Sequence, residues 1–265
     1  MSNHSIYHSL SLLLLISLSC QSSSDLTRPQ EVAQPNQVKV NTPAKAENPC
    51  LEFDKVNTLV RDGLIDRKEA QNKIRELIPK IRDYFQARGG HNTTPENWIF
   101  PVKGYGPKAI GGSNGNGYLP KGYDYFDGNK HGGHPAHDIF INDRNQDELD
   151  DTNGKLVEIL SMTSGVVVAR ANEWQPGSEL RGGKYIYIYN PATNGLFYYA
   201  HNREIFPELG AIVKPGDVIA TMGRSGKNAA ATRSPTHLHI TYLIIEDGYP
   251  KPKDLYQALL SAVRK

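Results

Sequence analysis

The chain has 265 residues, of which 38% are hydrophobic and 22% charged, an ordinary composition for a soluble globular protein of one large domain plus a smaller one. Its formal net charge of +2 gives no field strong enough to predict binding to nucleic acid. The 24 Gly, 17 Pro and 14 Tyr residues favour strands and turns over a helical bundle.

Residues 1–19 resemble a bacterial lipoprotein signal peptide. They contain an apolar run of about ten residues, too short to span a bilayer, which ends at Ser19-Cys20. No Lys or Arg precedes this run and Ser17 stands where leucine is usual, so a plain secretory signal remains the alternative. In both cases we expect an exported protein. A lipid on Cys20 would anchor it to a membrane, facing the periplasm or cell envelope.

Residues 20–48 are rich in Ser, Gln, Asn and Pro and contain no aromatic residue. They cannot bury enough apolar surface to fold, and this composition predicts a flexible linker. If Cys20 carries lipid, Cys50 is the remaining thiol and no intramolecular disulfide can form. We expect Cys50 to be a small buried residue or an idle thiol, without a catalytic role.

Residues 49–89 are predicted to form a helical hairpin. The first helix ends at Gly63, and Asp66 with Glu69 forms a capping box at the start of the second. Apolar residues then recur at helical spacing up to Gly89-Gly90, and Pro79 predicts a kink or a restart. The hairpin contains no histidine, so we expect it either to be dispensable for chemistry or to cover a cleft.

Residues 90–265 carry mainly β patterns. The segments 184–189 and 196–201 predict a hairpin around the turn 190–195. Further strands are expected at 165–170 and 239–245, with shorter ones within 210–226. Near the C-terminus, apolar residues recur again at helical spacing, at Leu255, Leu259 and Val263. The sequence therefore predicts a mainly β domain, preceded by a small helical hairpin and followed by a C-terminal helix.

Six of the nine histidines lie between residues 131 and 239, in three groups. In the first group Gly133 and Pro135 oppose a helix, and the following strand places Asp138 on one face with Phe140. A carboxylate entering a sheet among apolar residues needs a counter-charge, which a metal ion would supply.

The second group is His201 alone, and the third is His237-Leu238-His239. On a strand, both histidines of the third group share one face while Leu238 enters the core. Each group by itself is weak, and a strand His-x-His is as often an accident as a site. Together they offer His, Asp and His ligands, and three protein ligands with an open fourth position form the catalytic zinc arrangement.

The segment from about Trp98 to Tyr249 resembles the lysostaphin and LytM-type zinc peptidases, the M23 family. The family motif His-x-Gly-x-Asp is matched by residues 134–138, and Tyr-Ala-His by residues 199–201. A Gly-x-Ser-Gly turn at residues 223–226 is followed by His237-Leu238-His239. The resemblance implies a LytM-like antiparallel β-sandwich or barrel.

By this resemblance one Zn²⁺ per chain would be held by His134, Asp138 and His239, while His201 and His237 would be the catalytic residues. Either histidine could be the general base that acts on the zinc-activated water. Tyr187, Tyr199 and Thr241 are candidates to hydrogen-bond the ligand imidazoles. His131 and His137 are extra and are expected to be solvated loop residues, although His137 could replace a ligand if the loop differs.

Two residues depart from the family pattern. Ala136 replaces the glycine of the first motif, and Thr236 stands where proline is frequent. Neither departure removes a ligand.

The resemblance further implies an endopeptidase that cuts peptide bonds of bacterial cell-wall peptidoglycan, with exposed tyrosines and loops forming its groove. Two alternatives remain, a non-catalytic module that binds muropeptides and an activator of other cell-wall hydrolases. Family members that act as activators have lost their ligands, whereas all five positions are present here.

Overall fold

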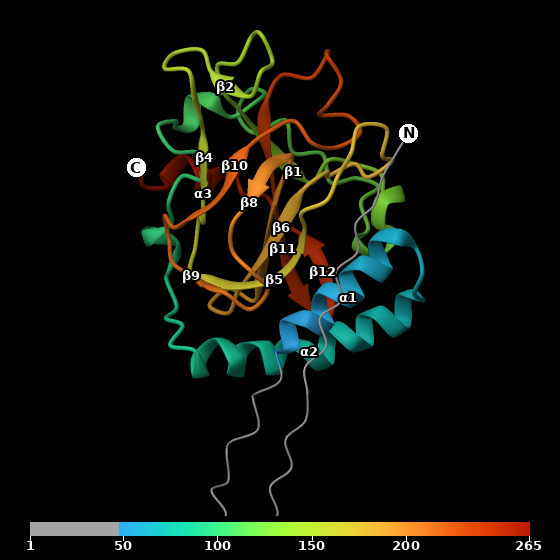
Figure 1. The fold of residues 1–265 in the computed structure, drawn as a ribbon. Coiled ribbons are helices and arrows are strands. Elements are labelled where there is room, and N and C mark those ends of the chain that lie inside the picture. The colour runs from blue at the N-terminus through green and yellow to red at the C-terminus, as the bar shows by residue number, and fades with distance from the viewer. Residues whose placement is uncertain (1–47) are drawn as a thin grey trace, which may run out of the picture. The chain divides into compact units, whose positions relative to one another are not determined.

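The computed structural model describes residues 48–265 (Figure 1). The predicted signal peptide, Cys20 and the predicted linker up to residue 47 lie outside the described residues. Within residues 48–265 no helix combines the length and the apolar character needed to cross a membrane. The described residues form one compact unit.

The predicted helical hairpin is present as α1 (Pro49–Asp62) and α2 (Arg67–Ala87). The first helix ends at Gly63, whose φ of 68° suits a residue without a Cβ. The second begins at Asp66, whose carboxylate accepts hydrogen bonds from the backbone N–H groups of Lys68 and Glu69. The predicted end of the first helix and the predicted start of the second are thus confirmed. Helix α2 continues through the exposed Pro79, so the alternative of a restart there is wrong.

Twelve strands and four short helical segments follow the hairpin. The strands are β1 (Ala136–Phe140), β2 (Leu149–Asp150), β3 (Lys155–Leu156), β4 (Glu158–Leu160), β5 (Gly165–Ala171), β6 (Tyr185–Asn190), β7 (Gly195–Ala200), β8 (Asn202–Ile205), β9 (Ile212–Val213), β10 (Val218–Met222), β11 (His237–Glu246) and β12 (Tyr249–Pro252). The helical segments are η1 (Pro95–Asn97), η2 (Pro107–Ala109), η3 (Tyr125–Lys130) and α3 (Tyr256–Ser261).

A seven-stranded antiparallel sheet organises the molecule. Its order is β1-β11-β7-β6-β5-β9, with β12 paired to β11, and a separate three-stranded sheet has the order β4-β10-β8. The mainly β, antiparallel fold predicted from the sequence is confirmed, including the hairpin of β6 and β7.

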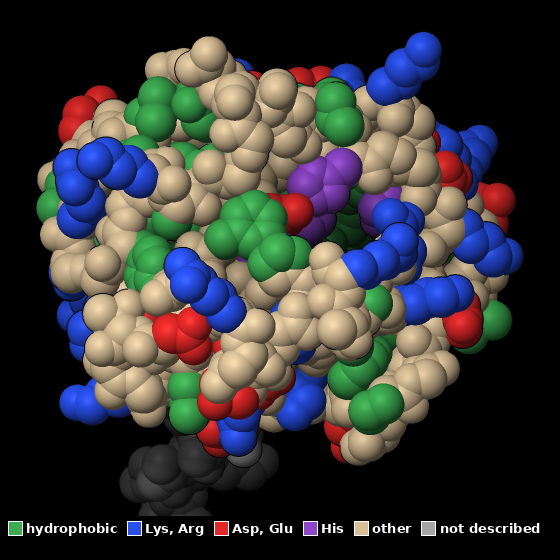
Figure 2. Space-filling view, turned by 90° about the horizontal axis from the view of Figure 1, so that it is seen from above, with side chains coloured by type: hydrophobic (Ala, Val, Ile, Leu, Met, Phe, Trp, Pro, Cys, Tyr) green, Lys and Arg blue, Asp and Glu red, His purple; other side chains and the backbone are tan. Residues whose placement is uncertain are grey.

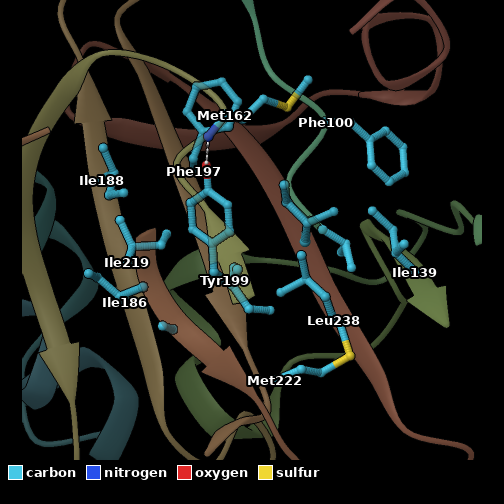
Figure 3. Packing of buried hydrophobic residues seen from close by; sticks show 14 of the residues in the cluster. Phe100, Ile139, Met162, Ile186, Ile188, Phe197, Tyr199, Ile219, Met222 and Leu238 are labelled. Carbon is cyan, nitrogen blue, oxygen red and sulfur yellow. Dashed lines mark hydrogen bonds between the residues drawn. The ribbon is translucent and has the colours of Figure 1, made fainter. Parts of the chain in front are cut away.

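Each face of the large sheet is covered by a different layer. On one face Ile186, Ile188 and Tyr199 pack against residues of the three-stranded sheet such as Ile219 (Figure 3). On the other face the tyrosines of β6 and the apolar residues of α1 and α2 form a second core cluster. Cys50 is part of that cluster, and its burial raises the pKa of the thiol to about 12. The hairpin therefore shares a core with the sheet.

The C-terminal helix is shorter than predicted. Leu255 caps α3 and Leu259 is buried in it, but α3 ends at Ser261. Val263 lies beyond the helix and is 50% exposed, while its backbone exchanges hydrogen bonds with Trp98 and Phe100. The helical spacing of Val263 after Leu259 therefore wrongly predicted that Val263 belongs to the helix. The chain leaves the helix before this residue and pairs with an extended segment.

Candidate metal and peptidase site

His134, Asp138 and His239 meet where β1 and β11 pair. The antiparallel register sets Asp138 directly opposite His239, so their side chains leave the same face of the sheet. His134 precedes β1, and two backbone hydrogen bonds with Leu119, of 2.7 and 2.8 Å, hold it in place. Residues about a hundred positions apart in the chain are thus brought together by one strand pair.

The spacing of their donor atoms fits one metal ion. His134 Nε2 lies 3.3 Å and His239 Nδ1 3.1 Å from Asp138 Oδ1. One ligand atom from each of these three residues lies within 4.8 Å of the other two. Ligand atoms on a tetrahedral zinc ion are about 3.3 Å apart, because each bond to zinc is about 2.0–2.1 Å long. The residues present therefore suit zinc in both type and spacing.

The second nitrogen of each imidazole is also engaged. His134 Nδ1 donates to the carbonyl of Gly117 over 2.9 Å, which leaves its Nε2 as a lone-pair donor facing Asp138. His239 Nε2 lies 3.3 Å from Thr241 Oγ1, which leaves Nδ1 toward Asp138. Hydrogen bonds of this kind orient the imidazoles that bind metals.

His201 reaches the site through an unusual backbone conformation. Tyr199 at the end of β7 points into the core, and continued alternation would send His201 to that same face. Instead His201 has a φ of 67°, which turns its ring to within 4.9 Å of the His237 ring. A positive φ in a residue other than glycine costs about 1 kcal/mol or more, and such residues gather at functional sites.

His201 and His237 present free nitrogens to the same opening. The Nδ1 atoms donate to the carbonyls of Ser225 (2.8 Å) and Pro235 (2.7 Å), so each Nε2 is available to accept a proton. Burial, reinforced by the neighbouring His237 and His239, holds the pKa of His201 well below its usual value. His201 is therefore neutral at neutral pH.

Asp138 carries the negative charge of the site. Burial would raise the pKa of its carboxyl group, but the hydrogen bonds with His134 and His239 hold that pKa well below its usual range. His237 Nε2 also lies 3.7 Å from its Oδ1. An ionised carboxylate surrounded by three imidazoles is ready to bind a divalent cation.

A comparison with family models matches residues 149–250 to peptidase family M23. Residues 149–250 are therefore similar to the M23 peptidase family. This segment includes His201, His237 and His239, and strand β1 brings His134 and Asp138 from outside it to the same place. The resemblance found in the sequence is thus confirmed. A comparison with curated protein sequences found no match.

Solved structures that are similar to the chain include several peptidases. The catalytic domain of lysostaphin from Staphylococcus simulans is 20% identical, with 54% of this chain and 86% of that chain covered and a TM-score of 0.35. A zinc containing peptidase from Vibrio cholerae is 18% identical, with 61% and 39% covered and a TM-score of 0.36. The candidate glycyl-glycine endopeptidase lytM from Ruminococcus gnavus is 20% identical, with 83% and 86% covered and a TM-score of 0.43. The chain thus spans well under two thirds of the Vibrio cholerae peptidase.

His137 is not a solvated loop residue, so the prediction for it was wrong. It lies in β1 with 1% of its surface exposed, on the face opposite Asp138. Its Nε2 is 2.8 Å from Asp254 Oδ1, and its ring stacks on Tyr118. His137 therefore ties β1 to the segment before α3 and does not face His134, Asp138 and His239. The pattern that could have shown this is strand alternation, which places residues 137 and 138 on opposite faces.

His131 also differs from its prediction, because it is only partly exposed and lines the same cleft as His134 and Asp138. Of the three candidate partners for the imidazoles, Thr241 does contact His239. Tyr199 instead accepts a hydrogen bond from the Met162 N–H in the core on the other face (Figure 3). Tyr187 lines a neighbouring cavity, and its side chain is buried beneath the helical layer.

The site opens into a cleft with two extensions. Figure 2 shows histidine side chains around a hollow, with hydrophobic side chains on one side and Lys or Arg side chains on the other. On one side His134 and Asp138 adjoin a space lined by Phe140 and three glycines of the segment 111–117. On the other side lies a cavity between the sheet, η3 and α1, which we call the tyrosine cavity. It is lined by Tyr123, Tyr125, Tyr185, Tyr187 and Tyr198 together with three residues of α1.

Proposed function

We propose that the protein is a zinc-dependent endopeptidase that hydrolyses peptide bonds of bacterial cell-wall peptidoglycan. The observation that carries the proposal is the spacing of the His134, Asp138 and His239 donor atoms, which matches that of three ligands on one zinc ion. The M23 match of residues 149–250 supports the peptidase activity and the wall substrate.

In this proposal His134, Asp138 and His239 hold the ion. When bound, zinc supplies Lewis-acid chemistry, polarising a water molecule or a carbonyl oxygen. His201 and His237 act beside it. The neutral His201 can accept a proton at Nε2, because its Nδ1 proton is committed to the Ser225 carbonyl. His237 presents its own Nε2 to the same opening, where it can take part in proton transfer or, once protonated, donate to a developing oxyanion.

The main alternative is a non-catalytic protein that binds muropeptides or activates other wall hydrolases. Both ligand and catalytic positions are complete, and the strained backbone of His201 argues against this alternative. A module that only binds peptides gains nothing from holding a buried histidine in a costly conformation beside a metal site.

The test is the hydrolysis of purified peptidoglycan together with the zinc content of the purified full chain. We expect about one zinc per chain and the release of soluble fragments with new amino groups, both lost in His134→Ala. His91→Ala is the matched control, because His91 is exposed and outside the cleft, and it should keep zinc and activity. Bound zinc without any cleaved peptide bond would favour the alternative.

We further propose that the protein is exported and anchored through a lipid on Cys20. The support is the sequence pattern of residues 1–20, with its apolar run ending before a cysteine. A Cys20→Ala chain should lose labelling by a fatty-acid analogue and move from the membrane fraction to the soluble one. Unchanged membrane fractionation would point to another anchor.

A further inference from the structure

Arg181 lies at the junction of the metal cleft and the tyrosine cavity. It lines both spaces, as do His131, Gly182, Tyr198 and His239. Its position is fixed by η3, since Asn129 Oδ1 accepts a hydrogen bond from the Arg181 backbone N–H and the His131 carbonyl accepts one from the guanidinium. An arginine held in this way is organised before any ligand arrives.

The guanidinium of Arg181 has spare hydrogen-bonding capacity. Within residues 48–265 no carboxylate forms an ion pair with it, and the acceptor that its side chain meets is the His131 carbonyl at 2.6 Å; the nearby His131 Nδ1 already donates to the Gly132 carbonyl. Arginine offers five N–H donors, and a partly buried guanidinium is stabilised when an anion accepts several of them. The remaining donors therefore favour an anionic ligand.

The charges around the tyrosine cavity also favour an anionic ligand. Its described lining includes Arg61 and Arg181 but no Asp or Glu. Arg61 already forms two hydrogen bonds with the Asp62 carboxylate, of 2.7 and 2.8 Å, so its charge is compensated. Arg181 is thus the cation left to receive a ligand where the metal cleft meets the cavity.

We propose that Arg181 is a specificity residue that binds a free carboxylate of the substrate peptide, on the part of the substrate that enters the tyrosine cavity. The proposal rests on the proposed function, because it takes a peptide lying in the metal cleft as its starting point. A planar guanidinium binds a carboxylate through two parallel hydrogen bonds, which an amide of the same shape cannot reproduce.

The test compares soluble muropeptides before and after their carboxylates are converted to amides with carbodiimide and ammonia. Binding to the metal-free full chain is measured by calorimetry, so that hydrolysis does not enter the result. We expect the acid forms to bind about 10- to 100-fold more tightly than the amides. Arg181→Gln should reduce this preference to within about threefold, and Arg181→Lys should retain part of it as a point charge.

Lys227→Gln is the control for the loss of one positive charge near the cleft. Lys227 is exposed, pairs with Glu179 and lies on the neighbouring loop, where its N–H bonds the Leu180 carbonyl. This variant should keep the full preference. Equal affinity of the wild type for acid and amide forms, including no measurable binding of either, would overturn the proposal. Failure of the zinc peptidase assignment would show separately, as intact peptidoglycan in the presence of zinc.

Discussion

Residue-scale geometry explains how a regular sheet carries this site. From the sequence, strand alternation predicted that His237 and His239 share a face of one strand and that Asp138 shares a face of another strand with Phe140. The register of β1 and β11 brings these two faces together. His201 reaches the same face because its φ of 67° breaks the alternation after β7. No periodic pattern in the sequence predicts a residue with a positive φ, and only the Tyr-Ala-His motif indicated His201.

The contact between Thr241 and His239 gives a prediction at this scale. Thr241→Val keeps the shape of the side chain but removes the oxygen 3.3 Å from His239 Nε2. We expect zinc affinity to fall about 10- to 100-fold, because the imidazole loses the partner that orients it. The measurement is competition for zinc against a chelating dye.

Thr221→Val is the matched control for this substitution. Thr221 is also a buried strand threonine, but its Oγ1 has no hydrogen-bond partner among the described residues. Thr221→Val should leave zinc affinity unchanged. An equal effect of both substitutions would show that Thr241 acts on stability and not through His239.

At the scale of elements, the sequence predicted best where one pattern governs a whole segment. The helical stripe with its caps located α1 and α2, and alternation located β6, β7 and β11. Predictions from the sequence failed where tertiary contacts determine the conformation or the burial of a residue. Val263 continues a helical interval but pairs with the extended segment at Trp98 and Phe100, and His137 was taken for a loop residue although it is buried in β1.

Helix α2 contains a proline that its packing does not require. Pro79 is exposed inside the helix, where it removes a backbone hydrogen bond and crowds the carbonyl of Arg75. Pro79→Ala should raise the free energy of unfolding by about 1–3 kcal/mol. Chemical denaturation measures this, with the exposed neighbour Lys80→Ala as a control expected to change it by less than about 0.5 kcal/mol. No gain from Pro79→Ala would mean that the helix is already relaxed around the proline.

At the scale of the whole molecule, a different layer covers each face of the large sheet, and only one face carries the site. The three-stranded sheet packs aliphatic side chains against one face, whereas the other face carries the tyrosines of β6, the helices and the site. The sequence suggested that the helical hairpin could be dispensable or could cover a cleft. Its residues Asn57, Val60 and Arg61 in fact close one side of the tyrosine cavity, and their apolar neighbours complete a core. Such a shared core has no local pattern, because its two halves come from distant segments.

The proposed peptidase activity requires two histidines of one strand to have different roles. His239 is proposed to hold the metal with His134 and Asp138, whereas His237, beside it on β11, is proposed to serve the reaction. The most direct test is the zinc content of purified His239→Ala and His237→Ala, measured beside the hydrolysis of peptidoglycan. We predict that His239→Ala loses both zinc and activity. His237→Ala should keep about one zinc per chain while its activity falls about 10²- to 10⁴-fold, the range for a removed acid–base group. Equal zinc content in the two variants would contradict the account.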